Sequence, residues 1–161
     1  MFNLKSKILI ITFTALCVFT SACGRMSLNE YPSISVDNSD ASASITLNSN
    51  LLGDNTQLSD DTLLYLSNTT KDEVFILTSF ETNSSGDSSL IANTLANSGY
   101  SDESNLNAQV SAVYTLINEA NQVKHYSIIT DDYICTFTAY DNESNFDYAD
   151  QIISTVEIIQ N

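Results

Sequence analysis

Three alternating segments joined by very short connections constrain the fold of this chain more than any other sequence feature. The segments are AQVSAVYTLIN (108–118), VKHYSIIT (123–130) and YICTFTAY (133–140), and EANQ and DD connect them. Alternation of this kind predicts β-strands with two different faces. Connections this short allow only antiparallel pairing, because parallel strands need a crossover of about a dozen residues or more. The sequence therefore predicts an antiparallel three-stranded unit.

The DD turn also predicts how the last two of these strands are aligned. A two-residue connection places residues at equal distances from the turn opposite each other. His125 is therefore expected to face Thr138, and Cys135 to face Ile128.

Earlier segments predict further strands. TLLYLSN (62–68) and EVFILTSF (73–80) surround the polar insert TTKD, which is typical of an antiparallel hairpin. SITLNSNLL (44–52) alternates at its start and predicts a first strand that ends at Gly53.

Two segments change to helical spacing. DSSLIANTLANSGY (87–100) offers Asp87 or Ser88 as N-cap and Gly99 as the stop, and its small residues favour packing across a sheet. FDYADQIISTVEII (146–159) predicts a second amphipathic helix with a short extended tail.

This order of elements predicts a single α+β domain over residues 44–161. The economical arrangement is one antiparallel sheet of about six strands with two helices packed on it. The string of elements over 44–159 resembles the PsbP/Mog1 family fold, an α/β/α sandwich, in its hairpin, its middle helix ending in NSGY, its three-stranded unit and its closing IISTVEI. Functions within that superfamily differ widely, so the resemblance implies a fold and no activity.

The N-terminus has the composition of an export signal. Lys5 and Lys7 precede ILIITFTALCVFT (8–20), which is 13 residues without a charge. A bilayer-spanning helix needs about 20 apolar residues, so this segment is too short to span. A basic start, a short apolar core and a small-residue exit predict a signal peptide over residues 1–22.

The exit TSAC (20–23) resembles the lipobox of bacterial lipoproteins. The resemblance implies that Cys23 receives a diacylglycerol and further acyl chains such as palmitate, and that cleavage falls between Ala22 and Cys23. Thr20 departs from the pattern, because the family has an aliphatic residue there, and this leaves an ordinary secretory signal as the alternative. The implied location is the extracytoplasmic side of the cell membrane, or the outer membrane in a diderm host.

Residues 23–43 are expected to be the lipidated N-terminus and a flexible tether, rich in Ser, Asn and Asp. The alternative is an edge strand at SISV (33–36). After cleavage only 3 basic residues would remain beside 20 acidic ones, a net charge of −17. Such a charge repels nucleic acid, which excludes that class of partner.

Cys135 and His125 are the candidates for a nucleophile and a base. The predicted register separates them along the strands, so a buried core thiol and a solvent-facing histidine are the favoured interpretations. Cys17 would leave with the signal and Cys23 would be acylated, which leaves Cys135 without a disulfide partner. No zinc-ligand spacing or hydrolase motif is present, and no catalytic, cofactor or metal residues are assigned.

The acidic segment DNESNFDYAD (141–150) resembles the start of a calcium-binding loop. Phe146 occupies the position that needs Gly, and Ile152 the position of the bidentate Glu, so capping of the following helix by Asn145 or Asp147 is favoured. A calcium-binding surface protein and an envelope hydrolase that uses these acids remain the alternative functions.

The expected function is a membrane-anchored, non-enzymatic binding or accessory module with a protein or peptide partner in the envelope. Tyrosines suit such contacts. The candidates are Tyr65, Tyr114, Tyr126, Tyr133 and Tyr140, for which a core role is the alternative.

Overall fold

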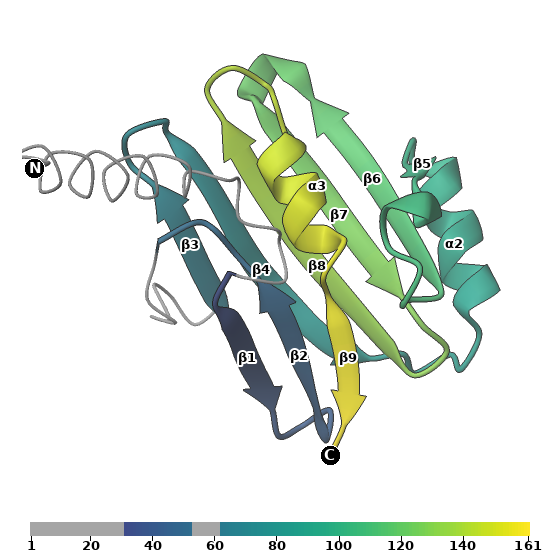
Figure 1. Cartoon of the computed structure of the whole chain (residues 1–161). Coiled ribbons are helices and arrows are strands. Elements are labelled where there is room, and N and C mark those ends of the chain that lie inside the picture. Colours follow the sequence, from purple (N-terminus) through teal and green to yellow (C-terminus); the bar gives the residue numbers. More distant parts are fainter. Residues whose placement is uncertain (1–30, 53–61) are drawn as a thin grey trace, which may run out of the picture.

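The computed structural model describes residues 31–52 and 62–161. Figure 1 shows a large sheet with a smaller sheet and one helix on the same side of it. In chain order the elements are β1 (Ser33–Asn38), β2 (Ala43–Asn48), β3 (Leu64–Asn68), β4 (Glu73–Thr82), α2 (Ser88–Asn97), β5 (Ser101–Asp102), the 3₁₀ turn η2 (Ser104–Leu106), β6 (Ala112–Asn118), the 3₁₀ turn η3 (Glu119–Asn121), β7 (Val123–Ile129), β8 (Tyr133–Asp141), α3 (Asp147–Ile153) and β9 (Glu157–Gln160).

The large sheet has six strands in the order β3-β4-β8-β7-β6-β5, and all of its neighbours are antiparallel. The predicted hairpin (β3–β4) and three-stranded unit (β6–β7–β8) are both confirmed. The register across the β7–β8 turn is also confirmed, because His125 pairs with Thr138 and Ile128 with Cys135. Pairing of β4 with β8 joins the hairpin to the three-stranded unit.

The second sheet corrects two predictions. β1 pairs with β2 from Ser33↔Asn48 to Asn38↔Ala43, so the tether expected up to residue 43 is wrong from Ser33 onward, and the edge-strand alternative holds. β2 continues to the C-terminal strand β9, so the prediction of a single sheet is also wrong. β1 is short and has only two apolar residues, and it pairs with β2 across a turn of four residues. The part of the predicted tether before residue 31 lies outside the described residues.

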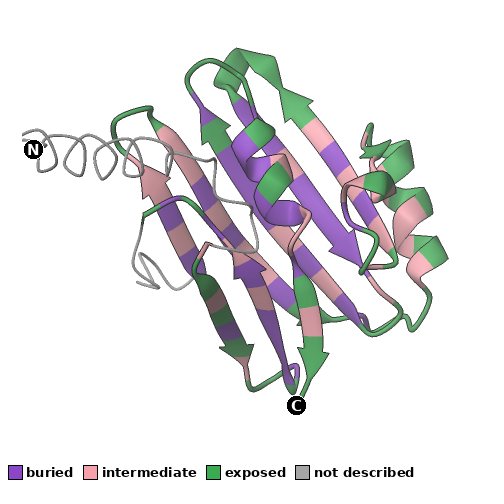
Figure 2. Ribbon diagram, viewed as in Figure 1, coloured by how far each residue is buried: buried purple, intermediate pink, exposed green. Residues whose placement is uncertain are grey.

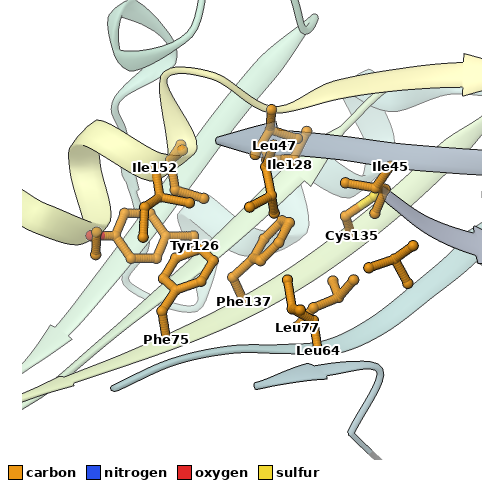
Figure 3. Packing of buried hydrophobic residues seen from close by; sticks show 14 of the residues in the cluster. Ile45, Leu47, Leu64, Phe75, Leu77, Tyr126, Ile128, Cys135, Phe137 and Ile152 are labelled. Atoms are coloured by element: carbon orange, nitrogen blue, oxygen red, sulfur yellow. The ribbon is translucent and has the colours of Figure 1, made fainter. Parts of the chain in front are cut away.

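The core lies between the two sheets and under α3. Figure 2 shows the buried residues along α3, β2 and the strands beneath them, and Figure 3 shows β2 side chains packed on those of β7 and β8. Phe75 and Phe137 stack with their ring centroids 5.3 Å apart. α3 contributes Tyr148, Ala149, Ile152 and Ile153 to this core, all of them buried. Burying this apolar surface is the main favourable contribution to folding.

The helix α2 has the predicted ends but not the predicted packing. Asp87 is its N-cap and accepts hydrogen bonds from the hydroxyl and the N–H of Ser89, which lower the pKa of this carboxyl. Gly99 follows the helix at φ 89°, a conformation that favours glycine. No residue of α2 is buried, and Leu90 is 56% exposed. The helix therefore lies against β6 and β7 of the sheet without a fully buried face.

Candidate functional site

The residues assigned to lipid attachment, Ala22 and Cys23, lie outside the described residues. Lipidation and cleavage therefore stay predictions. Among the helices in residues 31–52 and 62–161, none combines the length and apolar character needed to cross a bilayer.

Cys135 and His125 lie on opposite faces of the six-stranded sheet. Cys135 belongs to the fully buried side of β8, and burial raises the pKa of its thiol. His125 is half-buried on the other side, where its Nδ1 lies 3.1 Å from the hydroxyl of Thr138. The sheet separates the two groups, so they form no nucleophile–base pair. The interpretation of Cys135 as a core thiol is confirmed.

The acidic segment 141–150 serves its own loop and the start of α3. Buried Asp141 accepts a hydrogen bond from the N–H of Glu143, and Asn145 accepts one from the N–H of Asp147, 3.1 Å away. The N-cap position itself belongs to Phe146 and has no side-chain capping bond, so the expected capping by Asn145 or Asp147 is wrong; Asn145 lies one residue earlier and Asp147 is the first residue of the helix. Asp150 points the other way, into the protein. Over the described ranges, no three His, Cys, Asp or Glu side chains are grouped closely enough to hold a metal ion.

The sequence did not single out the most unusual polar group of the fold, the ammonium of Lys124. Its side chain is only 5% exposed, because Lys124 lies on the core face of β7 beside Tyr126 and Ile128. Its Nζ is 2.7 Å from Oδ1 of Asp150 on α3 and 3.0 Å from Oε2 of Glu103 before η2. We call these residues, together with Tyr126, the lysine cluster.

Tyr126 completes the lysine cluster from the same strand. Its hydroxyl donates to Oδ1 of Asp150 at 2.6 Å, and its ring centroid lies 4.9 Å from the Lys124 Nζ. Burial and the adjacent Asp150 raise the pKa of this phenol well above its usual range. A cation held by two carboxylates and a ring face is well compensated for its loss of hydration.

This geometry favours a structural role for the lysine cluster. The ammonium bonds to both carboxylates and the phenol bonds to one of them, so the polar atoms of Lys124 and Tyr126 are engaged within the cluster. The cluster joins three segments that are distant in sequence: β7, the segment before η2, and α3. A lysine that alternates with Tyr126 and Ile128 on an apolar strand face was the signal that could have predicted it.

The five candidate tyrosines divide between the two faces of the sheet. Tyr126 and Tyr133 are buried in the core, so the alternative interpretation holds for these two. Tyr65, Tyr114 and Tyr140 occupy the opposite side, which we call the outer face. Alternation of buried and partly exposed residues along β3, β4, β6 and β8 defines this face.

Two polar hollows lie beside Tyr140 at one end of the sheet. One has a volume of about 210 Å³ and includes Tyr140, Asp72 and Asp141 in its wall. The other, of about 330 Å³, shares Asp72 and Asp141 and adds Glu73 and Glu143. Lys71 also lines the second hollow, so carboxylates outnumber the one basic group at this end of the molecule.

Comparison of the chain with protein-family models, with curated proteins and with solved structures gives no match.

Proposed function

We propose that this chain is a bacterial lipoprotein whose folded part is a non-enzymatic binding or accessory module outside the cytoplasm. The observation that carries the proposal is the order of features before residue 24: two lysines, an uncharged apolar stretch, then TSAC. A diacylglycerol on Cys23, joined by a further acyl chain, would supply the two hydrophobic signals that stable anchoring requires. In a diderm host the outer membrane is the expected destination.

The start of β1 limits how far the module can lie from such an anchor. Ser33 is the first residue of that strand, ten residues after Cys23. An extended chain of this length spans at most about 35 Å. The tether proposed here is therefore half as long as the sequence pattern indicated, and the folded part stays close to the membrane surface.

Three features support a role in binding rather than catalysis. The thiol of Cys135 is buried and protonated, His125 is on the opposite face, and Lys124 is held by its own carboxylates. We also retain the PsbP/Mog1-like α/β/α arrangement as a proposal, for which the six-stranded antiparallel sheet and the helix α3 on one face are the support.

The test is the intact mass of the native protein after detergent extraction, combined with incorporation of labelled palmitate. We expect a chain that begins at Cys23 and carries acyl chains, and we expect Cys23→Ala to abolish both label and membrane retention. Cys17→Ala is the matched control, because that cysteine would leave with the signal peptide. A Cys23→Ala protein that is processed normally and stays in the membrane fraction would contradict the proposal.

A further inference from the structure

The outer face carries a continuous row of side chains across five strands. Each member pairs with the next in the sheet register, so the row runs from the β3 edge to β6, the neighbour of the other edge strand β5. Its members are Tyr65 on β3, Ile76 on β4, Thr138 on β8, His125 on β7 and Leu116 on β6. Tyr140 lies beside this row, pairs with Val74 and Val123, and is 43% exposed.

The absence of charge in this row contrasts with the rest of the chain, which has a net charge of −15. None of the five row residues, nor Tyr140, is a carboxylate, a lysine or an arginine. Acids stand at the margins instead. Glu81 pairs with Ile134 at one end, Asp102 pairs with Tyr114 at the β5 edge, and Asp72 shares a hollow with Tyr140 at the other end.

Within the described part of the chain, the main contacts of helix α2 with the six-stranded sheet are with β6 and β7. The small sheet and α3 pack on the core face (Figure 1). The row side chains on β3, β4, β7 and β6 are partly exposed, whereas Thr138 on β8 is buried. Partly exposed aliphatic and aromatic side chains gathered on one face are the usual mark of a contact surface.

The area and charge of the outer face distinguish between two possible binding partners, a second copy of this chain and a smaller protein segment. Five strands spaced about 4.8 Å apart span about 24 Å, and six residues along a strand, at about 3.4 Å each, span about 20 Å. The outer face around the row therefore has an area of roughly 500 Å². A stable dimer buries about 800 Å² on each partner. Two copies that each carry a net charge of −15 also repel each other. These arguments disfavour a second copy and favour a smaller, positively charged partner.

We propose that the outer face binds a basic segment of a partner protein, with apolar side chains on the Tyr65–Leu116 row and flanking lysines or arginines against the marginal acids. This inference rests on the binding role proposed above but not on the lipid anchor. If Cys23 carries no lipid, the outer face is unchanged and can still bind the segment. If the outer face binds no peptide, the evidence for lipidation of Cys23 is unchanged, so the two proposals can be refuted separately.

The chain contains no tryptophan, which makes a tryptophan in a synthetic peptide a selective fluorescent probe. We would titrate full-length protein in non-ionic detergent with the peptide Lys-Lys-Leu-Trp-Val-Lys-Lys at about 0.15 M salt, with detergent buffer as the blank. Two control peptides replace the lysines by glutamates, or Leu and Val by serines. We expect saturable binding of the first peptide, none of the acidic one, and about fivefold weaker binding of the serine one.

The protein variants locate the binding. The double variant Tyr65→Ser/Tyr140→Ser should weaken binding about tenfold, whereas Leu90→Ser on exposed α2 should change it by less than about twofold. Far-UV circular dichroism checks that both variants are folded, and the peptide controls need no variant at all. Equal binding of the serine peptide, or unchanged binding by the tyrosine variant, would overturn the proposal. So would a dimer in light scattering that Tyr140→Ser dissolves, because the occupant would then be a second copy.

Discussion

Replacing Lys124 by Met tests whether the lysine cluster holds α3 and the segment before η2 on the sheet. Met has a similar length and keeps the apolar stem of the side chain in the core, while the charge is removed. The two carboxylates then lose their cation, although Tyr126 can still donate to Asp150.

The exposures of the three charged groups set the expected magnitude. The Lys124 side chain is 5% exposed, but those of Glu103 and Asp150 are 32% and 29% exposed. At an effective dielectric constant of about 20, each contact corresponds to about 6 kcal/mol of Coulomb attraction, most of which offsets the lost hydration of the buried ammonium. Water can reach the carboxylates once the lysine is gone. We therefore expect Lys124→Met to lower the free energy of unfolding by about 1–3 kcal/mol.

The opposite change should be more damaging. The double variant Glu103→Gln/Asp150→Asn leaves a buried ammonium without a counter-charge, and we expect a loss of about 3–5 kcal/mol. The order of the two effects is a sharper prediction than either value, because it depends only on which partner is buried.

Urea unfolding followed by far-UV circular dichroism measures these differences. Lys71→Met is the matched control, since the Lys71 side chain is 68% exposed and its contact with Glu73 is 4.0 Å long. We expect that control to change stability by less than about 0.5 kcal/mol. The reasoning is refuted if Lys124→Met is as mild as Lys71→Met, or if the double carboxylate variant is more stable than Lys124→Met.

Two further predictions concern buried groups. Asn107 is 1% exposed and donates from Nδ2 to the carbonyls of Ile153 (2.7 Å) and Val156 (2.8 Å). In the same urea assay, Asn107→Ala should lower the free energy of unfolding by about 2–3 kcal/mol. Asn105→Ala, at an exposed position, should leave the free energy of unfolding nearly unchanged. The raised pKa of Cys135 means that the fold favours the neutral thiol. Its contribution to stability is fully present below the ordinary pKa of 9.0 and declines as the pH rises above it. Mass spectrometry of the Cys135 peptide should find no alkylation of the folded protein at pH 8 and full alkylation in urea; rapid labelling in the folded state would contradict the burial.

Local patterns predicted the parts of the fold whose partners are close in sequence. The β3–β4 hairpin, the pairing of His125 with Thr138 and the ends of α2 depend on turns and caps of a few residues, and all three are present. β1 was predicted only as the alternative to a tether, because its segment is rich in Ser, Asn and Asp and has just two apolar residues, although its partner β2 follows after a turn of four residues.

The candidate sites also differ in whether they depend on local pattern or on contacts between distant segments. The face of Cys135 follows from alternation along one strand, and its burial agreed with that prediction. The partners of Lys124 lie 21 and 26 residues away and arrive from two other elements, so the sequence could place the lysine on the core face but not name its counter-charges. The outer face likewise depends on strand order, which brings β3 and β6 into one surface.

By itself, the sequence determined the strands of the β3–β4 hairpin and of the β6–β7–β8 unit, the ends of α2, and which side of these strands is apolar, because these follow from side-chain periodicity and turn chemistry. Only the tertiary structure decided that a second sheet closes the core, that a buried cation ties α3 to β7, and that the outer face of the large sheet carries a row of side chains without carboxylates, lysines or arginines. Those features arise where segments distant in the chain meet, and contacts of that kind leave no local periodicity to read.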